Sequence, residues 1–369
     1  MAETMRAIGL MSGTSMDGVD LALLETDGEE IVRPVTAAFR PYHEDERAIL
    51  RRALEEAATL SDRDARPPAL AEAEAVVTTA HIQVVADFLG ARQMTPDMID
   101  IVGFHGQTVF HAPGRGLTIQ IGDGQRLADE IGIPVVYDFR AADVAAGGQG
   151  APFVPAYHRA LVRSSELPLP VAVLNIGGVA NVTFIGRDGD PVAFDTGPGN
   201  ALIDDLMRER TGAALDKDGR LAAEGRVDER ALAALMSHPY FEESYPKSLD
   251  RNAFSRSAVS SLSTADAAAT LTAFTAASIT AALRLLPAQP GRLVVCGGGA
   301  RNPTLLSALQ ERAGVKVSTA EEFGWSADSV EAEAFAYLAV RSRRGLPLTF
   351  PGTTGVELPT RGGVLVRPR

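Results

Sequence analysis

The chain has 369 residues, 46% of them hydrophobic, a formal net charge of −12 and a single cysteine, Cys296. This composition predicts about two folded domains, and the acidic balance argues against a nucleic-acid-binding or polybasic membrane-binding surface. One cysteine excludes an intramolecular disulfide and a cysteine-rich metal site, and without a signal sequence or an apolar run of membrane-spanning length we expect a cytoplasmic protein.

The first part of the chain opens with strands and then alternates helices with strands. Strand patterns cover residues 7–8, 21–25 and 31–41, and helical patterns cover 44–58 and 62–89. Shorter strands are expected at 99–104, 117–121 and 134–137, with a helix over 124–131. A set of strand hairpins followed by alternating helices and strands describes one ribonuclease-H-like unit.

A Gly- and Pro-rich crossing at residues 145–156 (AAGGQGAPFVPA) is the predicted boundary between two halves. The second half again opens with strand, glycine turn and strand, and its strands are expected at 171–176, 181–185, 192–194, 292–296 and 315–318. Helices are expected at 200–210, 264–286, 303–312 and 329–341, with a helical insertion and a loop at 216–249. We therefore predict an α/β protein with an N-terminal lobe, 1–145 plus 345–369, and a C-terminal lobe, 146–344.

Residues 9–20, GLMSGTSMDGVD, form a tight connection between the first two predicted strands. Small residues let backbone N–H groups converge on a phosphate, and hydroxyl groups add donors. Asp17 and Asp20 can hold a phosphate-bound Mg²⁺, which takes carboxylates and water as ligands. The pattern is not a Walker loop, because no lysine follows the glycines. An ordinary polar hairpin loop is the alternative.

Asp195 lies in the run PVAFDTGPGN, at the end of a predicted strand and before a Gly-Pro-Gly turn that opens a helix. A rigid sheet then fixes the carboxylate where ligands bind in such folds. The helix N-terminus is expected to favour its ionised form, and the neighbouring glycines can bring backbone donors to a phosphate. Asp195 is therefore predicted to be a general base. A turn aspartate that caps the helix at Asn200 is the alternative.

Two further glycine turns are candidates for nucleotide binding. NIGG at 175–178 separates two apolar strands, although any hairpin uses such glycines. CGGGARNP at 296–303 follows a Val-rich strand, and its glycines let a base or a ribose lie against the backbone. A dinucleotide fingerprint is the rival interpretation, but the glycine spacing is wrong for it. The residues predicted to contact the nucleotide are Asn175, Gly177, Gly178, Gly297, Gly298, Gly299 and Asn302.

Polar residues also follow the strands at 99–104 and 134–137. Arg140 can clamp a carboxylate or sugar oxygens with two hydrogen bonds. His105 fits a structural role or a substrate contact equally. Glu331 lies near the start of a helix, where the helix dipole favours its charge. The residues predicted to contact the substrate are His105, Gln107, Asp138, Arg140, Gly197 and Asn200.

Taken together, these runs resemble the anhydro-N-acetylmuramic acid kinase family. The matching runs appear in the family's order over nearly the whole chain: GLMSGTSMDGVD, GFHGQT, YDFRAADVAAGGQGAPFVPAYH, LNIGGVANV, FDTGPGN, CGGGARNP and VEAEAFAYLA. The runs GTSMDG, AAGGQGAPFVP and FDTGPGN are the most specific. The resemblance implies a two-lobed actin-like ATPase fold, in which two ribonuclease-H-like units flank a central cleft.

The resemblance also implies a function. The family uses ATP and Mg²⁺ to open the 1,6-anhydro bond of a sugar recovered from peptidoglycan and to phosphorylate its O6. Asp195 would activate the water that attacks C1, and Glu331 would help to hold the sugar or the water. The ATP phosphates would bind along the first loop, at Gly13, Thr14, Ser15, Met16, Asp17, Gly18, Val19 and Asp20.

One segment departs from the family pattern, which often reads PKSxGRE where this chain has PKSLDR at 246–251. Lys247, Ser248 and Arg251 still fit, while any role of Leu249 and Asp250 is open. The competing functions are a kinase for levoglucosan or another sugar, and a non-catalytic ATP-dependent binding module. We expect a small sugar as the substrate, a homodimer, and neither nucleic acid nor membrane as a partner.

Overall fold

The computed structural model describes residues 3–13, 15–326 and 329–369. It divides into two compact units, residues 1–164 with 329–369 and residues 165–328. These bounds differ from the predicted lobes, because residues 146–164 and 329–344 belong to the first unit. There α5 (Val154–Ser164) packs on α11 (Val330–Arg343), and α11 packs on the sheet.

The sheet of the first unit combines antiparallel and parallel strands. Its order is β12-β6-β4-β1-β2-β3, with β5 paired to β4. Strands β1, β2 and β3 form an antiparallel meander, whereas β1, β4 and β6 run parallel. The strands are β1 Met5–Ser12, β2 Gly18–Thr26, β3 Val32–Pro41, β4 Ile101–Ala112, β5 Leu117–Ile121, β6 Val135–Tyr137 and β12 Val364–Val366.

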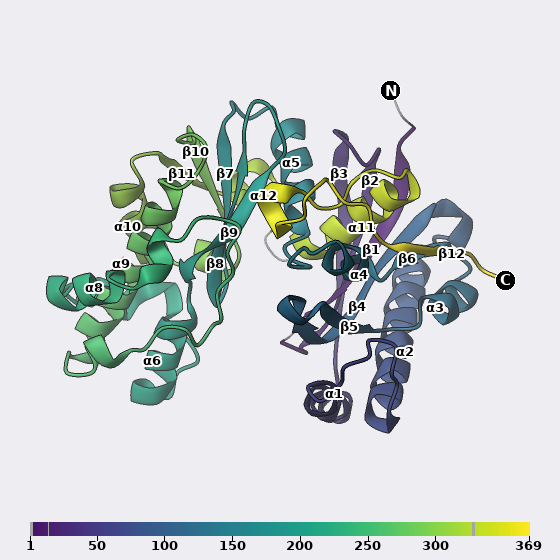
Figure 1. The fold of residues 1–369 in the computed structure, drawn as a ribbon, viewed down its shortest axis with the longest axis horizontal. Coiled ribbons are helices and arrows are strands. Elements are labelled where there is room, and N and C mark those ends of the chain that lie inside the picture. The colour runs from purple at the N-terminus through teal and green to yellow at the C-terminus, as the bar shows by residue number, and fades with distance from the viewer. Residues whose placement is uncertain (1–2, 14, 327–328) are drawn as a thin grey trace. The chain divides into compact units, whose positions relative to one another are not determined.

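Helices cover both faces of this sheet (Figure 1). Ile8 and Leu10 of β1 join a hydrophobic core with residues of α2 (Pro68–Ala91) such as Val77. Because strand side chains alternate between faces, Gly9 points to the opposite side, against α11. The remaining helices of the unit are α1 Glu44–Ala57, α2 Pro68–Ala91, α3 Gly124–Ile131, α4 Phe139–Ala145 and α12 Pro351–Thr354.

Two glycines let α11 approach the sheet closely. Gly9 and Gly103 are register partners on the parallel strands β1 and β4. A Cβ atom on Gly9 would overlap the carbonyl oxygen of Ala332, and one on Gly103 would overlap that of Phe335. The first turn of α11 is thereby fixed against the strand that leads into the first loop.

The second unit repeats the topology of the first. Its sheet has the order β11-β10-β7-β8-β9, with β7, β8 and β9 antiparallel and β7, β10 and β11 parallel. The strands are β7 Val171–Ile176, β8 Val179–Ile185, β9 Val192–Pro198, β10 Arg292–Cys296 and β11 Lys316–Thr319. The helices are α6 Ala201–Thr211, α7 Arg220–Glu224, α8 Glu229–Met236, α9 Thr264–Leu283 and α10 Pro303–Ala313.

In both units an antiparallel meander is extended from its first strand by two parallel strands. This repetition confirms the predicted fold class, an α/β protein built from two ribonuclease-H-like units, as in actin-like ATPases. Among the described residues, α9 alone has the length and composition to cross a membrane, but 78% of its most apolar window is buried inside the protein.

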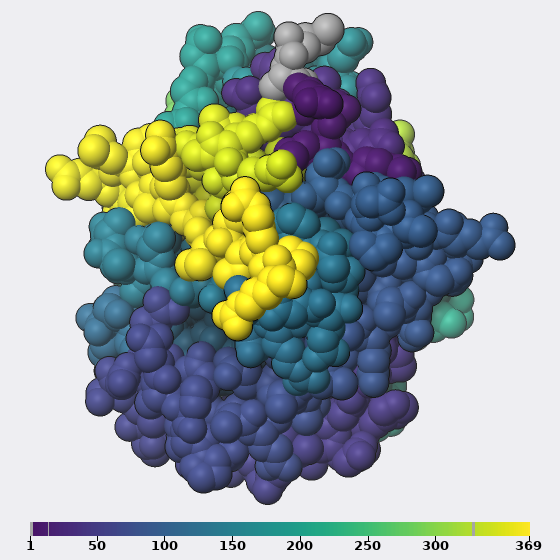
Figure 2. Space-filling model, turned by 90° about the vertical axis from the view of Figure 1, so that its right-hand side faces the viewer, coloured from purple at the N-terminus to yellow at the C-terminus, as the bar shows by residue number. Residues whose placement is uncertain are grey.

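Short 3-10 helices complete both units: η1 Pro96–Met98, η2 Pro113–Arg115, η3 Lys217–Gly219, η4 Pro239–Glu242, η5 Ser257–Val259, η6 Gly298–Arg301 and η7 Ala320–Phe323. The C-terminal segment lies over the surface of the first unit (Figure 2). There β12 pairs with β6, and the carbonyl of Arg367 accepts a hydrogen bond from Gln125 of α3.

Three element bounds differ from the sequence prediction in ways that matter for the site. Helix α2 begins at Pro68, not near residue 62, so residues 62–67 form a loop. Strand β4 continues to Ala112, so His105 and Gln107 lie within it. Strand β9 continues to Pro198, which places Asp195 inside the strand and not at its end.

Candidate functional site

Hydrogen bonds from buried polar side chains hold the start of the loop between β1 and β2. The hydroxyl of Ser12 donates to Oε1 of Gln107 at 2.5 Å and pairs with the hydroxyl of Tyr42 at 3.0 Å. Nε2 of Gln107 donates to the carbonyl of Gly13 at 3.0 Å. Gln107 is 1% exposed, so its contacts in this structure are with the loop.

The loop itself presents small residues and one carboxylate. Met16 has a positive φ of 54°, and its N–H donates to the carbonyl of Gly13 at 3.1 Å. The hydroxyl of Ser15 donates to Asp17 Oδ1 at 2.7 Å. Among the described residues that are not its chain neighbours, a Cβ atom on Gly13 would meet only Ser15 Oγ, at 3.6 Å, so the backbone there is open to a ligand.

The other residues predicted in this loop lie in different surroundings. Thr14 lies outside the described residues. Gly18 faces β3, where a side chain would overlap the carbonyl of Arg40, and Val19 is buried in the core. Asp17 is exposed and Asp20 is half-buried in β2. Among the described residues, no group of three or more His, Cys, Asp or Glu side chains could hold a metal ion.

Asp195 is held by hydrogen bonds to one segment of the second unit, residues 240–249. Its Oδ2 accepts a hydrogen bond from the N–H of Leu249 at 2.8 Å, and its own N–H donates to the carbonyl of Lys247 at 3.2 Å. The hydroxyl of Tyr240 donates to the Asp195 carbonyl at 2.6 Å. Lys247 closes the segment by donating to the Tyr240 carbonyl at 2.7 Å. Among the described residues, Oδ1 of Asp195 has no hydrogen-bond partner.

Burial raises the pKa of Asp195 from 3.8 to about 6, and the Leu249 hydrogen bond acts in the opposite direction. The expectation that the helix N-terminus would favour ionisation is therefore wrong, because desolvation of the half-buried carboxylate dominates. A carboxylate with this pKa is still mostly ionised at neutral pH. It can then accept a proton more readily than an ordinary aspartate.

The two glycine turns of the second unit lie against each other. A Cβ atom on Gly297 would overlap Oδ1 of Asn175, and one on Gly299 would crowd Ile176. The N–H of Asn200 donates to the carbonyl of Gly177 at 2.8 Å, and that of Gly199 to the carbonyl of Gly178 at 2.9 Å. These glycines are required because three backbone segments meet here.

A pocket of about 400 Å³ opens beside these turns. Gly298 and Asn200 line it, and within the part of the chain that the structure describes a Cβ atom on Gly298 would meet only Asn200 Nδ2, at 3.6 Å. Asn302 also lines it, and its Oδ1 caps α10 by accepting from Leu305 N–H at 3.0 Å. The other lining residues are Ile203, Asp204, Leu215, Asp216, Lys217, Asp218 and Arg301. Its volume lies in the range of small-ligand sites.

Gly197 and Asn200 were both predicted to contact the substrate. Gly197 is buried, and a side chain there would strike Ser278, so the glycine allows β9 to pack on α9. Asn200 precedes α6, but its side chain makes no capping bond; Nδ2 donates instead to the carbonyl of Ile176 at 3.3 Å.

In the first unit, His105 and Arg140 form a fixed pair. His105 Nδ1–H donates to the carbonyl of Gly106 at 2.8 Å, and Nε2 accepts from Arg140 at 3.0 and 3.2 Å. Burial and the Arg140 guanidinium hold the pKa of His105 well below its ordinary value. His105 is therefore neutral, and its contacts in this structure orient Arg140.

Asp143 holds the loop that completes this cluster. Arg140 donates to the carbonyl of Gly150 at 2.6 Å, and the N–H of Gly150 donates to Asp143 at 2.6 Å. The buried Asp143 also accepts from the hydroxyls of Thr349 and Thr354. One carboxylate thus fastens the loop at 146–153 to the C-terminal segment of the unit.

Glu331 and Glu333 begin α11 but differ in their surroundings. Glu333 is 3% exposed and accepts hydrogen bonds from Tyr157 and Ser329 at 2.6 and 2.7 Å, so it anchors the helix. Glu331 is exposed. Desolvation by the surrounding protein raises the pKa of Glu331, while Arg140 acts in the opposite direction.

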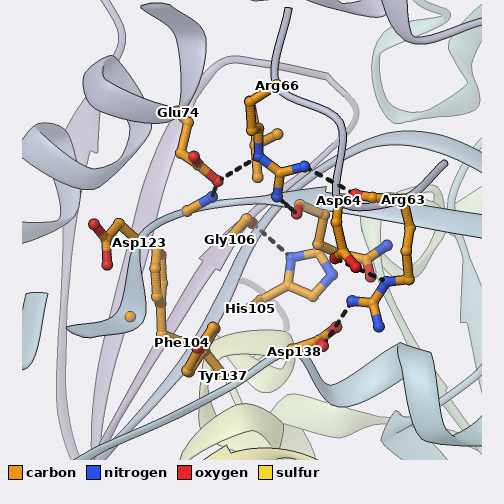
Figure 3. A pocket seen from close by; sticks show the side chains of 14 residues that line it. Arg63, Asp64, Arg66, Glu74, Phe104, His105, Gly106, Asp123, Tyr137 and Asp138 are labelled. Atoms are coloured by element: carbon orange, nitrogen blue, oxygen red, sulfur yellow. Dashed lines mark hydrogen bonds and ion pairs between the residues drawn. The ribbon is translucent and has the colours of Figure 1, made fainter. Parts of the chain in front are cut away.

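A second pocket, of about 280 Å³, lies in the first unit (Figure 3). His105 and Asp138 line it, as predicted substrate contacts, together with residues that the sequence analysis did not single out. Among these are Arg63, which donates to Asp138 at 2.7 Å, and Arg66, which donates to Glu74 at 3.0 Å. No motif pointed to either arginine, because both lie in a stretch whose composition is typical of a helix.

Comparison with known proteins places these features in a family. The model of the family described as anhydro-N-acetylmuramic acid kinase matches residues 5–367. A relative of that name from Azorhizobium caulinodans is 57% identical over 369 residues, 99% of this chain and 100% of the relative. Another, from Nitrobacter winogradskyi, is 56% identical over 365 residues, again 99% of this chain and 100% of the relative. The chain belongs to the anhydro-N-acetylmuramic acid kinase family.

Proposed function

We propose that this protein transfers the γ-phosphoryl group of ATP to O6 of 1,6-anhydro-N-acetylmuramic acid while water opens the anhydro bridge. The water oxygen bonds to C1, and the C1–O6 bond breaks with its electron pair passing to O6. O6 then bonds to the γ-phosphorus, and ADP leaves. The products are N-acetylmuramic acid 6-phosphate and ADP, so the reaction serves the recycling of peptidoglycan sugars.

Asp195 is proposed to be the base that takes a proton from the attacking water. The observation that carries this proposal is the geometry of its carboxylate. Oδ2 is anchored by Leu249 N–H, while Oδ1 has no partner among the described residues and is left for water. Burial raises the pKa of Asp195 to about 6, which matches a base that works near neutral pH. The proton leaves to solvent after the reaction.

Two glycine-containing turns are proposed to bind parts of the nucleotide. The open backbone at Gly298 and the pocket of about 400 Å³ suit a base and ribose, and the loop around Gly13 suits phosphates. Mg²⁺ would be held by the carboxylates of Asp17 and Asp20 together with phosphate oxygens and water, a ligand set this ion commonly takes. When bound, the ion neutralises charge on the transferring phosphoryl group.

The sugar is proposed to contact Arg140 and Glu331. Arg140 is oriented by His105 and Gly150, and the structure contains no ion pair of its guanidinium among the described residues, so its charge remains available. Glu331 is exposed at the start of α11 and can accept hydrogen bonds from sugar hydroxyls. A fixed cation and a fixed carboxylate would align the sugar for attack, and positioning of this kind supplies much of the catalysis in phosphoryl transfer.

The test is a comparison of the wild-type enzyme with Asp195→Asn. Wild-type protein should consume ATP with anhydro-N-acetylmuramic acid in preference to levoglucosan. Asp195→Asn keeps the shape and removes the basicity, so kcat should fall by about 10²–10⁴-fold, with little change in sugar or ATP affinity. Near wild-type kcat in the folded variant would remove Asp195 from this role, and faster turnover of levoglucosan would reassign the substrate.

A cytoplasmic location and a homodimer complete the proposal. Both are expectations of the sequence analysis, and a cytoplasmic location suits a sugar kinase that consumes ATP. Light scattering of the purified protein at micromolar concentration measures its molar mass in solution. A mass of one chain would exclude the dimer.

A further inference from the structure

The pocket of about 280 Å³ in the first unit lies beside the middle of β4 and the C-terminal end of β6. Phe104 of β4 and Tyr137 of β6 are register partners, and both line it. On the other side of β4, Ser12 at the end of β1 pairs with Gln107, which holds Gly13. The pocket is therefore next to the loop proposed to bind phosphates, at the edge of the sheet where ligands bind in α/β folds.

Its outer wall is the loop between α1 and α2, and two arginines fasten that loop across the pocket (Figure 3). Arg66 donates to Glu74, to the carbonyl of Arg63 at 2.8 Å and to that of Gln120 at 3.5 Å. Arg63 reaches the opposite wall, where it donates to Asp138. Aromatic rings at the base and planar polar groups around the rim suit a sugar ring.

The charges around the pocket exclude a carboxylate as its ligand. Two guanidinium groups face four carboxylates, Asp64, Glu74, Asp123 and Asp138, which leaves an excess of two negative formal charges. Arg63 already forms ion pairs with Asp138 and Asp64, and Arg66 forms one with Glu74. An anionic group would meet net repulsion here, whereas hydroxyl and amide groups would find acceptors and donors.

Three polar atoms of residues that line the pocket lack hydrogen-bond partners, and one of them, Arg63 Nε, is in an ion pair with Asp64 Oδ1 at 3.9 Å. Arg63 Nε, Asp138 Oδ1 and Gln120 Oε1 are buried without a hydrogen-bond partner among the described residues. Buried polar groups are nearly always satisfied, so unsatisfied ones gathered at one pocket indicate a missing ligand or water. One donor and two acceptors match the mixed hydrogen bonding of sugar hydroxyl and acetamido groups.

We infer that this pocket binds the uncharged hydroxyl and acetamido side of the sugar substrate, and that Arg63 is its specificity-determining residue. The inference rests on the proposed function for the identity of the sugar. It adds that the lactyl carboxylate lies outside this pocket. The α1–α2 loop then controls which sugar is accepted, through groups that carry no part of the chemistry.

The experiment uses Arg63→Ala in the full-length protein. The KM for anhydro-N-acetylmuramic acid should rise about tenfold, as for loss of hydrogen bonds to an uncharged ligand, while kcat and the KM for ATP stay unchanged. Calorimetry without nucleotide should show the same increase in Kd for the acid and for its methyl ester. The matched control is Arg52→Ala, which removes an ion pair of similar length, 2.8 Å, between the exposed residues Arg52 and Glu72.

An unchanged sugar KM and Kd in folded Arg63→Ala would overturn the inference. Weaker binding of the acid without weaker binding of its methyl ester would show that the pocket does hold the carboxylate. If Arg63→Ala folds poorly, Asp138→Asn replaces it as the test variant, because it keeps the shape of the side chain. Asp138→Asn should raise the Kd of both the acid and its methyl ester. Calorimetry detects the sugar even if no turnover occurs. Wild-type binding without turnover would therefore count against the proposed reaction, whereas turnover without an effect at Arg63 would count only against the pocket.

Discussion

Leu249→Pro isolates the backbone hydrogen bond that holds the proposed catalytic base. Proline lacks the N–H that donates to Asp195 Oδ2 at 2.8 Å, so the substitution removes one interaction that stabilises the ionised carboxylate. A hydrogen bond to a charged group contributes about 1.5–3 kcal/mol. At about 1.4 kcal/mol per pKa unit, its loss should raise the pKa of Asp195 by about one to two units. The lower value applies because the side chain is half-buried and water can replace part of the bond.

The assay is the pH dependence of kcat/KM, whose acid limb reports the pKa of the base in the free enzyme. The base works when ionised, so activity falls as the pH drops through that pKa, which lies at about 6 in the wild type. In Leu249→Pro the limb should move upward by about one pH unit. Activity above pH 8 should change much less than activity at pH 6.

Leu249→Ala is the matched control, because it shortens the same side chain and keeps the N–H. Its acid limb should coincide with that of the wild type. If Leu249→Pro is folded, as judged by its melting temperature and circular dichroism, and its limb does not move, the hydrogen bond does not set the pKa. If both variants move the limb equally, the side chain is responsible and the reasoning fails.

Four further predictions follow from other contacts. Asp195→Asn should raise Tm at pH 7.5 and lose that advantage toward pH 4, since the raised pKa means that ionisation of this carboxyl costs stability as pH increases from about 4 to about 6. Gly298→Val should raise the KM for ATP several-fold in steady-state assays, because the side chain would enter the pocket. Gly103→Ala should lower the free energy of unfolding in urea by about 1–3 kcal/mol through overpacking against α11. Asp143→Asn should raise the KM for the sugar, because Gly150 would no longer fix Arg140.

Each of these has a contrary outcome. Equal Tm values for Asp195→Asn and wild type at both pH values would show that the carboxyl is not desolvated. Unchanged ATP kinetics in Gly298→Val would move the nucleotide elsewhere. Gly90→Ala in α2, where no atom of a described residue outside the local backbone lies within 4 Å of the added Cβ, should be neutral or stabilising. If Gly90→Ala lowered the free energy of unfolding as much as Gly103→Ala, the packing argument would be refuted. A normal sugar KM in Asp143→Asn would make that carboxylate purely structural.

The repeated units could be predicted from the sequence because their signals are local. Alternating apolar residues and glycine turns mark strands and hairpins within a few positions, and the run around residue 9 and the run around residue 177 both carry them. The family motifs likewise mark individual residues such as Asp195, whose position in a strand of the second unit the structure bears out, although the strand continues beyond it.

Contacts made by backbone atoms leave no comparable signal in the sequence. The N–H of Leu249 donates to Asp195 whatever side chain residue 249 carries. This contact is therefore kept although the sequence at 249 and 250 departs from the family pattern, and the residue types there gave no indication of it. The register of Gly9 with Gly103 depends on pairing between strands far apart in the sequence. The ionisation of Asp195 was predicted from a helix terminus, but desolvation, which depends on the whole surrounding unit, has the larger effect.

The division of the first unit into two stretches of chain has a consequence for synthesis. Helix α11 emerges from the ribosome only after all of residues 165–328. It packs, however, on β1 and β4, which are synthesised much earlier. Until then, the glycine-lined face of β1 and β4 lacks its covering helix, while the second unit already has its full sequence and can fold as a block. Nascent chains should therefore acquire a protease-resistant second unit before a resistant first one.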